Sequence, residues 1–232
     1  MEIIPVIDVM GGKVVHASRG NRERYPLLQS CLTESCEPID IIKDILAFYS
    51  FPIIYIADLD AIIDGEFDEQ RYHEISSVFP NIEFWLDAGI KTQTEWRKVN
   101  QYFNVHPVIG SETLFEPLWL KEPLVSEKSI LSLDFQKGHF LGNKALLSDP
   151  GFWPKSIIVM NLDCIGSQSG PDFNLLMQIQ SQTENEVIAS GGVRGPSDLL
   201  SLKEKGIKQV LVASVLHDGR LTKEDIFMLS GS

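Results

Sequence analysis

Ile56-Ala57-Asp58-Leu59-Asp60 and Val159-Met160-Asn161-Leu162-Asp163 are two similar stretches that stand 103 residues apart in the chain. The same offset of 103 relates Leu86-Asp87-Ala88-Gly89-Ile90-Lys91 to Ala189-Ser190-Gly191-Gly192-Val193-Arg194. It also relates Val108-Ile109-Gly110-Ser111 to Leu211-Val212-Ala213-Ser214. One offset held across three segments indicates an internal repeat. The sequence therefore predicts two similar halves.

Short, β-branched apolar runs surround these stretches and alternate with segments of helical periodicity. Near-continuous apolar runs are typical of parallel strands buried on both faces. The predicted strands are residues 3–8, 53–58, 83–87, 107–109, 130–134, 157–161, 186–189 and 209–212. The predicted helices are residues 39–49, 69–78, 94–103, 118–125, 173–180, 196–205 and 223–228. This alternation predicts an α/β fold, a single closed (βα)8 TIM barrel over residues 1–232, with half-barrels of approximately 1–126 and 127–232.

Composition narrows the functional classes. The 232 residues are 44% hydrophobic and 22% charged, as in ordinary folded proteins, and the net charge is −12. Such a charge repels phosphate backbones, so we expect no nucleic-acid partner. No apolar run approaches the ~18 residues of a membrane span, so we expect no membrane partner and a cytoplasmic location. Cys31 and Cys36 lack a second pair, which favours free thiols over a zinc site.

The first half carries a long loop. Ile7-Asp8 and Leu133-Asp134 stand 126 residues apart, so the first half contains about 23 more residues than the second after its first strand, within residues 10–38. A loop of this length is usually functional, often as a lid, although a flexible insertion is the alternative. We predict that His16, Arg19 and Arg22 of this loop contact substrate, because arginine pairs with phosphate or carboxylate groups.

Acidic and amide side chains end several predicted strands. The carboxyl ends of barrel strands form the active face. Asp8 and Asp134 occupy equivalent places in the two halves, so they should face each other and divide acid and base chemistry. We predict that Asp8, Asp134 and Asn161 are catalytic, although each could instead cap a turn. Asp58 and Asp60 are interpreted as helix caps or as residues that hold the two half-barrels together.

Glycine-rich strand ends predict phosphate binding, because exposed N–H groups and small side chains suit an anion. Ser190-Gly191-Gly192-Val193-Arg194 precedes a predicted helix start, and Ser214 follows the neighbouring strand. The repeat predicts a second phosphate site on the opposite side of the mouth. The candidates are Gly191, Gly192, Ser214, Gly89, Gly110, Ser111 and Ser169. Tight strand-to-helix turns are the alternative, and Asp87 adds an unfavourable negative charge beside Gly89.

The chain resembles the histidine-biosynthesis barrels, namely the ribotide isomerase and its cyclase relative. The resemblance covers nearly the whole chain. It rests on Ile4-Pro5-Val6-Ile7-Asp8, Gly12-Lys13-Val14-Val15, Asp58-Leu59-Asp60, Ser132-Leu133-Asp134, Ser169-Gly170-Pro171 and Ala189-Ser190-Gly191-Gly192-Val193. It implies a half-barrel repeat, a bis-phosphate ligand, no metal or organic cofactor, and an Amadori-type isomerisation by two aspartates, one of which matches Asp8.

The chain departs from this family pattern at positions that carry function. The second family aspartate lies in an Asp-Gly-Thr pattern, which here reads Ile165-Gly166-Ser167. Met160 replaces a threonine, Asp87 a glycine, Ala213 a glycine and His16 an arginine. Loss of a general acid typically costs about 10²–10⁴-fold in rate, unless another group replaces it; His16, Asp163 and Asp87 are the candidates.

Three functions remain open from the sequence. The first is aldose–ketose isomerisation of a phosphorylated, phosphoribosyl-type small molecule by an isomerase (intramolecular oxidoreductase) of the ribotide-isomerase kind. The second is a divergent paralogue with another reaction in one-carbon cofactor (methanopterin-type) biosynthesis. Residues 19–27 of this chain resemble the first loop of that group of paralogues. The third is a non-catalytic protein that binds a phosphate ligand. The sequence leaves the substrate, the pathway and the oligomeric state open.

Overall fold

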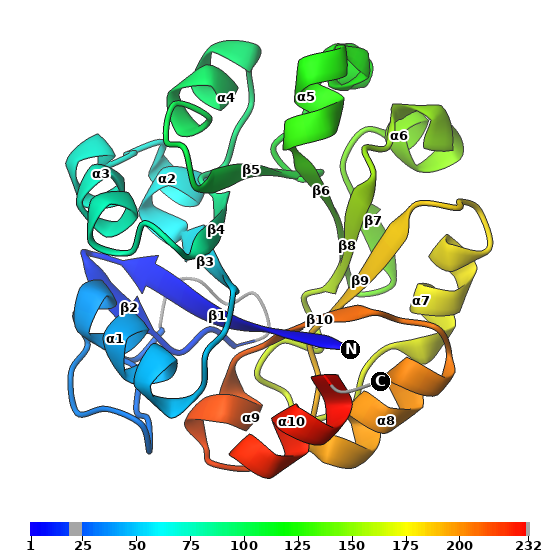
Figure 1. Cartoon of the computed structure of the whole chain (residues 1–232). Helices are drawn as coiled ribbons and strands as arrows, with labels where there is room; N and C mark the ends of the chain where they lie inside the picture. The colour runs from blue at the N-terminus through cyan, green and yellow to red at the C-terminus, as the bar shows by residue number, and fades with distance from the viewer. Residues whose placement is uncertain (19–24, 231–232) are drawn as a thin grey trace.

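The strands form one closed sheet in the computed structural model, which describes residues 1–18 and 25–230. Within these residues, eight parallel strands pair in chain order, and the last pairs with the first (Figure 1). They are β1 (Glu2–Met10), β3 (Ile53–Asp58), β4 (Glu83–Asp87), β5 (Val105–Gly110), β6 (Ile130–Gln136), β8 (Ser156–Asn161), β9 (Glu186–Ser190) and β10 (Gln209–Val212). The eight predicted strands and the TIM-barrel fold class are confirmed.

Helices surround the barrel on its outside (Figure 1). They are α1 (Pro38–Phe48), α2 (Leu59–Asp64), α3 (Glu69–Val78), α4 (Gln93–Val99), α5 (Pro123–Lys128), α6 (Lys144–Ser148), α7 (Phe173–Gln180), α8 (Pro196–Glu204), α9 (Ser214–His217) and α10 (Lys223–Ser230), with 3-10 turns η2 (Pro117–Lys121) and η3 (Pro150–Phe152). Every helix of the described chain is too short or too polar to cross a lipid bilayer.

Two helix predictions were wrong in detail. The helix expected over residues 94–103 ends at Val99 as α4. Residues 118–125 were expected to form a single helix, but η2 ends at Lys121 and α5 begins at Pro123. The residue before a proline is pushed out of the helical region, and Glu122 is extended, with φ −63° and ψ 129°. The proline therefore splits the segment and starts a new helix at its first position.

Strand side chains alternate between two apolar cores. Ile4, Tyr55 and Ile158 belong to a cluster built almost entirely from strand residues, which fills the barrel. Ile54 and Ile157 belong to a second cluster that includes helix residues. Burying each such side chain contributes roughly 1.5–3 kcal/mol. The period of two fixes which side chains point inward, and Asp8 and Asp134 continue the inward rows of β1 and β6 beyond the apolar layers.

The first strand of each half continues into a hairpin. β2 (Lys13–Val15) pairs with β1, and β7 (His139–Leu141) pairs with β6, both antiparallel. Their turns have positive φ at both central residues, 57° and 76° at Gly11-Gly12 and 51° and 73° at Lys137-Gly138. This is the type I′ pattern, which matches strand twist. The two hairpins repeat the same geometry at the offset of 126 residues.

Carboxylates after the next strands hold these turns. The N–H of Gly11 donates to both carboxylate oxygens of Asp60, at 3.0 and 2.8 Å. The N–H of Lys137 donates to Asp163 at 2.5 Å, and Asp60 and Asp163 stand 103 residues apart. Asp58 caps α2 by accepting from the N–H of Ala61 at 3.1 Å. The helix-capping role predicted for Asp58 is therefore confirmed, whereas Asp60 holds a turn of its own half and does not join the two half-barrels through these bonds.

Candidate active site

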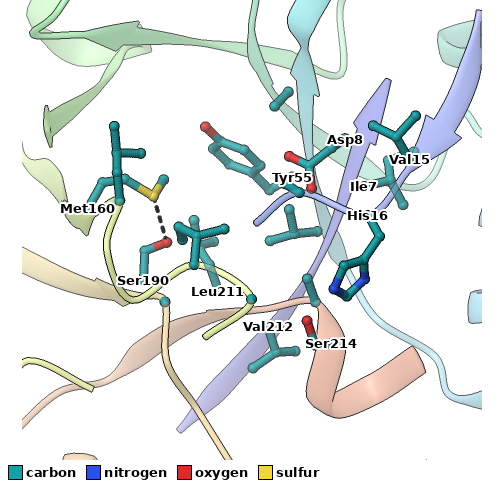
Figure 2. Close-up of a pocket in the computed structure, with 18 of the residues that line it drawn as sticks. Ile7, Asp8, Val15, His16, Tyr55, Met160, Ser190, Leu211, Val212 and Ser214 are labelled. Carbon is teal, nitrogen blue, oxygen red and sulfur yellow. Dashed lines mark hydrogen bonds between the residues drawn. The ribbon is translucent and has the colours of Figure 1, made fainter. Parts of the chain in front are cut away.

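A pocket opens at the carboxyl ends of the strands and receives side chains from both halves of the barrel (Figure 2). Apolar side chains such as Val15, Leu162 and Ile165 form much of its wall. Its acidic residues are Asp8, Asp87, Glu112 and Asp134. Concave sites with mostly apolar walls and a few convergent polar groups are the usual form of small-molecule sites. This mouth pocket is the candidate active site.

Asp8 and Asp134 enter the mouth pocket from matched places. Asp8 pairs with Val15 across the first hairpin, and Asp134 pairs with Leu141 across the second. Both carboxyl groups belong to inward rows, and Asp8 points into the pocket beside Tyr55 (Figure 2). The geometry therefore brings together the two aspartates that the sequence singled out.

Asp134 is buried and strongly hydrogen-bonded. Only 5% of its surface is exposed. The Ser132 hydroxyl donates to its Oδ1 at 2.6 Å, while the Ser111 hydroxyl and the Glu112 N–H lie 3.1 and 3.3 Å from its Oδ2. Burial raises the pKa of Asp134 to about 7, with the neighbouring Glu112 and Asp87 adding to the rise. At neutral pH this carboxyl group is balanced between donor and acceptor of a proton.

Tyr55 lies in the barrel interior beneath the same pocket. Its hydroxyl donates to Oδ2 of Asp87 at 3.3 Å. Burial raises its pKa well above the ordinary value, followed by the negative charges of Asp87, Asp134 and Asp8. Tyr55 therefore stays a neutral hydrogen-bond donor among three aspartates. The sequence analysis missed it, because a tyrosine in an apolar strand run is read as core; its inward position in the period of two was the available signal.

The opposite wall of the pocket contains the glycine-rich turn after β9. Gly191, Gly192 and Ser214 line the pocket, and the two glycines have φ of 91° and 81°. A Cβ on Gly192 would stand 2.1 Å from the backbone oxygen of Gly170, so glycine is also required for packing there. His16 lies close to Ser214 in Figure 2, as a loop residue facing this wall.

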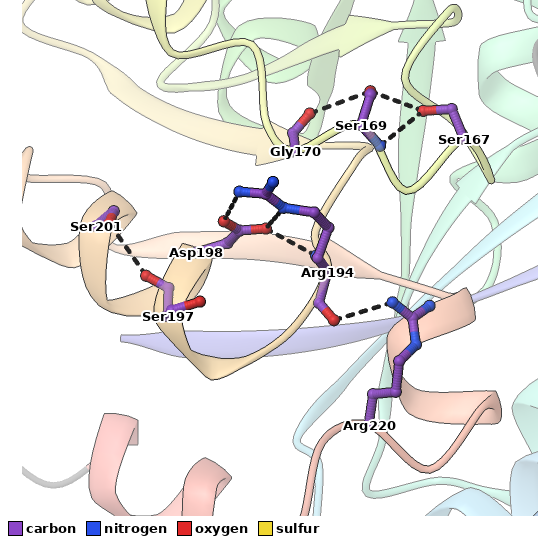
Figure 3. A network of polar contacts seen from close by, with 8 residues as sticks. All are labelled: Ser167, Ser169, Gly170, Arg194, Ser197, Asp198, Ser201 and Arg220. Atoms are coloured by element: carbon purple, nitrogen blue, oxygen red, sulfur yellow. Dashed lines mark hydrogen bonds and ion pairs between the residues drawn. The ribbon is translucent and has the colours of Figure 1, made fainter.

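A charged network holds this turn from behind (Figure 3). The N–H, Nε and Nη2 of Arg194 donate to the Asp198 carboxylate at 2.8, 2.9 and 2.7 Å. Arg220 donates to the backbone oxygen of Arg194 at 2.9 Å, and the Gly170 N–H donates to Gly192 at 3.0 Å. Bidentate pairs of this kind fix orientation. The turn is thus anchored independently of any ligand.

Several predicted site residues lie outside the pocket lining. The Asn161 amide donates to Asp172 at 2.8 Å and accepts from the Asp163 N–H at 3.1 Å, so Asn161 organises the loop after β8, and its catalytic role stays a prediction. The Ser169 hydroxyl contacts Ser167 at 2.8 Å in that loop (Figure 3). Arg19 and Arg22 lie outside the described residues.

The second predicted phosphate site is also outside the lining. Gly89, Gly110 and Ser111 do not face the pocket, whereas their neighbours Asp87 and Glu112 do. The Gly89 N–H donates to Asp87 at 3.1 Å, and the Ser111 hydroxyl lies between Asp134 and the Leu141 oxygen. Protein oxygens therefore occupy the donors that the prediction assigned to a second phosphate.

His217 is a further pocket residue that sequence reasoning passed over. It is 3% exposed, and its Nδ1 lies 2.9 Å from the Ser30 hydroxyl. Burial lowers its pKa to about 4, so it is neutral at pH 7. In the described part of the chain, no three residues of the types His, Cys, Asp and Glu gather in a metal-binding arrangement. The three cysteines are free thiols.

Comparison with known proteins assigns the family. The sequence profile described as histidine biosynthesis protein matches residues 2–149 and 153–222. The chain belongs to this family. It is 30% identical over 231 residues to an uncharacterized protein of Methanocaldococcus jannaschii, covering 97% of each chain. It is 26% identical over 248 residues to a bis-phosphoribosyl imidazole carboxamide isomerase of Campylobacter concisus, covering 100% of both.

A similarly named isomerase of Carboxydothermus hydrogenoformans is 26% identical over 252 residues, covering 100% of this chain and 99% of the relative. The resemblance seen in the sequence motifs is therefore confirmed, and relatives over the full length are named as isomerases. Asp87, Met160 and Ile165, the positions at which the resemblance implies departures from the family pattern, all line the mouth pocket. The Ser190 hydroxyl lies 3.0 Å from Sδ of Met160, so the thioether is part of the pocket's hydrogen bonding (Figure 2).

Proposed function

We propose that the protein is an isomerase that moves a proton within a phosphorylated, phosphoribosyl-type small molecule, converting an aminoaldose to an aminoketose. One observation carries the proposal: two aspartates from equivalent strand ends share one pocket, and Asp134 alone is deeply buried with its pKa raised to about 7. Pairs of carboxyl groups in unlike environments divide acid and base roles.

In this proposal Asp134 is the acid. Its proton passes to the ring oxygen of the sugar, the bond between that oxygen and C1 breaks, and the nitrogen at C1 forms a protonated imine. Asp8 then takes the proton from C2 as a carboxylate, which gives an enolamine. Tautomerisation to the ketone returns both side chains to their starting states. Atoms and electrons balance without a redox partner.

The phosphate of the substrate binds at Gly191, Gly192 and Ser214. Backbone N–H groups in such turns form anion-binding concavities, and this turn is held in place by the Arg194–Asp198 pair. His16 faces the same wall from the first loop. Binding energy at the phosphate keeps C1 and C2 near the aspartates, which is how remote groups contribute to catalysis.

A second candidate is a divergent reaction on another phosphorylated ligand, as in one-carbon cofactor biosynthesis. Ile165 lines the pocket where the family motif has its second aspartate, and Met160 replaces the motif threonine. Both changes remove polar groups from the β8 side of the pocket. They favour a substrate that differs there from the one named for the isomerase relatives.

The deciding experiment is an isomerase assay with the bis-phosphoribosyl imidazole carboxamide substrate, on the unaltered protein and on Asp8→Asn. Where the unaltered protein turns this substrate over, we expect Asp8→Asn to lose roughly 10²–10⁴-fold in rate while substrate affinity stays within about threefold. Asp60→Asn is the matched control, because Asp60 binds the Gly11 N–H and does not line the pocket.

No turnover by the unaltered protein above the Asp8→Asn background would exclude this reaction, and equal turnover well above background would exclude the role of Asp8. Tight binding without turnover would indicate the divergent reaction or a protein that only binds the phosphate ligand. Turnover lost equally in Asp60→Asn would show that the loss reflects structure rather than chemistry.

A further inference from the structure

We propose that the ligand of the mouth pocket carries unlike ends: one phosphate at the β9–β10 wall and a cationic, nitrogen-bearing group, such as a protonated amine or amidine, at the β4–β5 wall. This inference rests on the proposed function and adds the charge pattern of the substrate. It departs from the bis-phosphate ligand that the family resemblance implies.

The two walls occupy equivalent positions in the two halves. Asp87 ends β4 where Ser190 ends β9, and Glu112 follows β5 where Val215 follows β10, each pair 103 residues apart. All four residues line the pocket. The two walls therefore stand at equivalent strand ends, while the side chains that line them differ by two carboxylates.

The backbone N–H groups of the β4–β5 wall are also less available to an anionic ligand. At the β4–β5 wall, the Gly89 N–H donates to Asp87 at 3.1 Å, and the Glu112 N–H donates to Asp134 at 3.3 Å. The serines at the offset of 103 also differ, because Ser111 is fully buried and lies 3.1 Å from Asp134, whereas Ser214 lines the pocket.

The negative charges at the β4–β5 wall indicate which end of the ligand binds there. Asp87 and Glu112 lie close enough to Asp134 to raise the pKa of its carboxyl group, and Asp87 is the largest charge acting on Tyr55. A second phosphate at this wall would add further like charge in a partly desolvated space. A protonated amine or amidine instead supplies donors to carboxylate oxygens, as charge-assisted hydrogen bonds.

The test is isothermal titration of the unaltered protein with three probes: glucose-6-phosphate, glucosamine-6-phosphate and fructose-1,6-bisphosphate. The first two differ only in a hydroxyl exchanged for an ammonium group, and the third adds a second phosphate. We expect glucosamine-6-phosphate to bind about tenfold more tightly than glucose-6-phosphate, and the bisphosphate to bind most weakly, since charge-assisted pairs are the stronger ones.

The residues of the β9–β10 wall define a matched variant of the β4–β5 wall. The double substitution Asp87→Ser with Glu112→Val installs the residues of the β9–β10 wall at the β4–β5 wall. We expect it to abolish the preference for the ammonium probe and to strengthen bisphosphate binding about tenfold. Ser214→Asp, at the phosphate wall, should weaken all three probes alike.

The outcomes separate the two proposals. If the bisphosphate binds the unaltered protein most tightly while Ser214→Asp still weakens every probe, the unlike-ends inference is wrong and the phosphate wall stands. If no probe binds the unaltered protein, the phosphate wall fails, and both proposals fall with it. The ranking in the unaltered protein decides the inference even if the double variant does not fold.

Discussion

The two walls of the mouth pocket stand at equivalent strand ends in the two halves but have opposite chemistry. The turn after β4 and the turn after β9 both carry a left-handed glycine, Gly89 and Gly192, each packed against a backbone neighbour. Each turn is also held by a carboxylate one helical turn on, since Lys91 N–H donates to Glu95 at 2.8 Å and Arg194 N–H to Asp198 at 2.8 Å. The scaffold needs these features, while the residues facing the pocket are free to differ.

Asp8 and Asp134 likewise occupy equivalent positions but have different surroundings. Val6 stands two residues before Asp8, and Ser132 stands two residues before Asp134, in equivalent inward rows. Ser132 donates to Asp134, and Ser111 reaches it from β5. Equivalent positions in the two halves therefore do not guarantee equal proton affinities, because the pKa depends on every neighbour that contacts the carboxyl group.

The strongest way to test the shared backbone is to substitute its glycines. Gly192→Ala places a Cβ 2.1 Å from the Gly170 oxygen, and Gly89→Ala places one 2.6 Å from Cα of Ile62, both at positive φ. We expect each to lower the free energy of unfolding by about 4 kcal/mol, measured by chemical denaturation. Gly195→Ala, with nothing within 4 Å of its Cβ, is the control and should change little. A large effect at only one turn would break the equivalence.

A smaller effect on stability is expected at His217, a residue of the second half. The equivalent position in the first half is Leu114. The pKa of His217 is lowered to about 4 by burial, so the unfolded chain binds the proton first as pH falls. Stability is lost between the ordinary pKa of about 6.5 and pH 4, by about 3 kcal/mol at most. His217→Leu should remove that loss. Unfolding free energies measured from pH 7 to 4 that stay parallel for the two proteins would contradict this prediction.

Asp134 changes stability with pH in the opposite direction from His217. Its pKa is raised to about 7, so the folded chain keeps a proton that the unfolded chain releases near pH 4, and stability falls as pH rises between these values. Asp134→Asn, which keeps the shape of the side chain, should flatten this slope over pH 4–7. The same titration of Asp8→Asn provides the comparison across the pocket. A steeper slope in Asp134→Asn would show that the buried carboxyl group is ionised throughout.

The smallest expected effect lies in the hairpin turns. Lys137 has φ 51° where the first half has Gly11 with φ 57°. The left-handed region costs a residue with a Cβ roughly 1–2 kcal/mol, partly offset by the flexibility of glycine when unfolded. Lys137→Gly should therefore raise the free energy of unfolding by about 0.5–1 kcal/mol, and Gly11→Lys should lower it. Thermal melts of both variants measure the pair, and a loss of stability in Lys137→Gly would contradict the matched-turn description.

Much of the fold could be predicted because its signals are local. The apolar strand runs, the offset of 103 residues and the helix starts at Pro196 and Lys223 all appear within short windows of sequence. The hairpins and α2 were missed, since three-residue strands and six-residue helices carry little periodicity. The pocket positions of Asp8, Asp134, Gly191 and Gly192 followed from the rule that strand ends face the mouth.

The sequence by itself determined the barrel, the family, and the placement of two aspartates and a glycine-rich turn at one mouth, because strand alternation and repeat spacing are properties of the chain. Only the tertiary structure decided that Asn161 turns to Asp172, that Gly89 N–H is taken by Asp87, and that Asp134 holds its proton near pH 7. These outcomes depend on burial and on hydrogen bonds between residues far apart in sequence, such as Ser111 and Asp134, which no local pattern encodes.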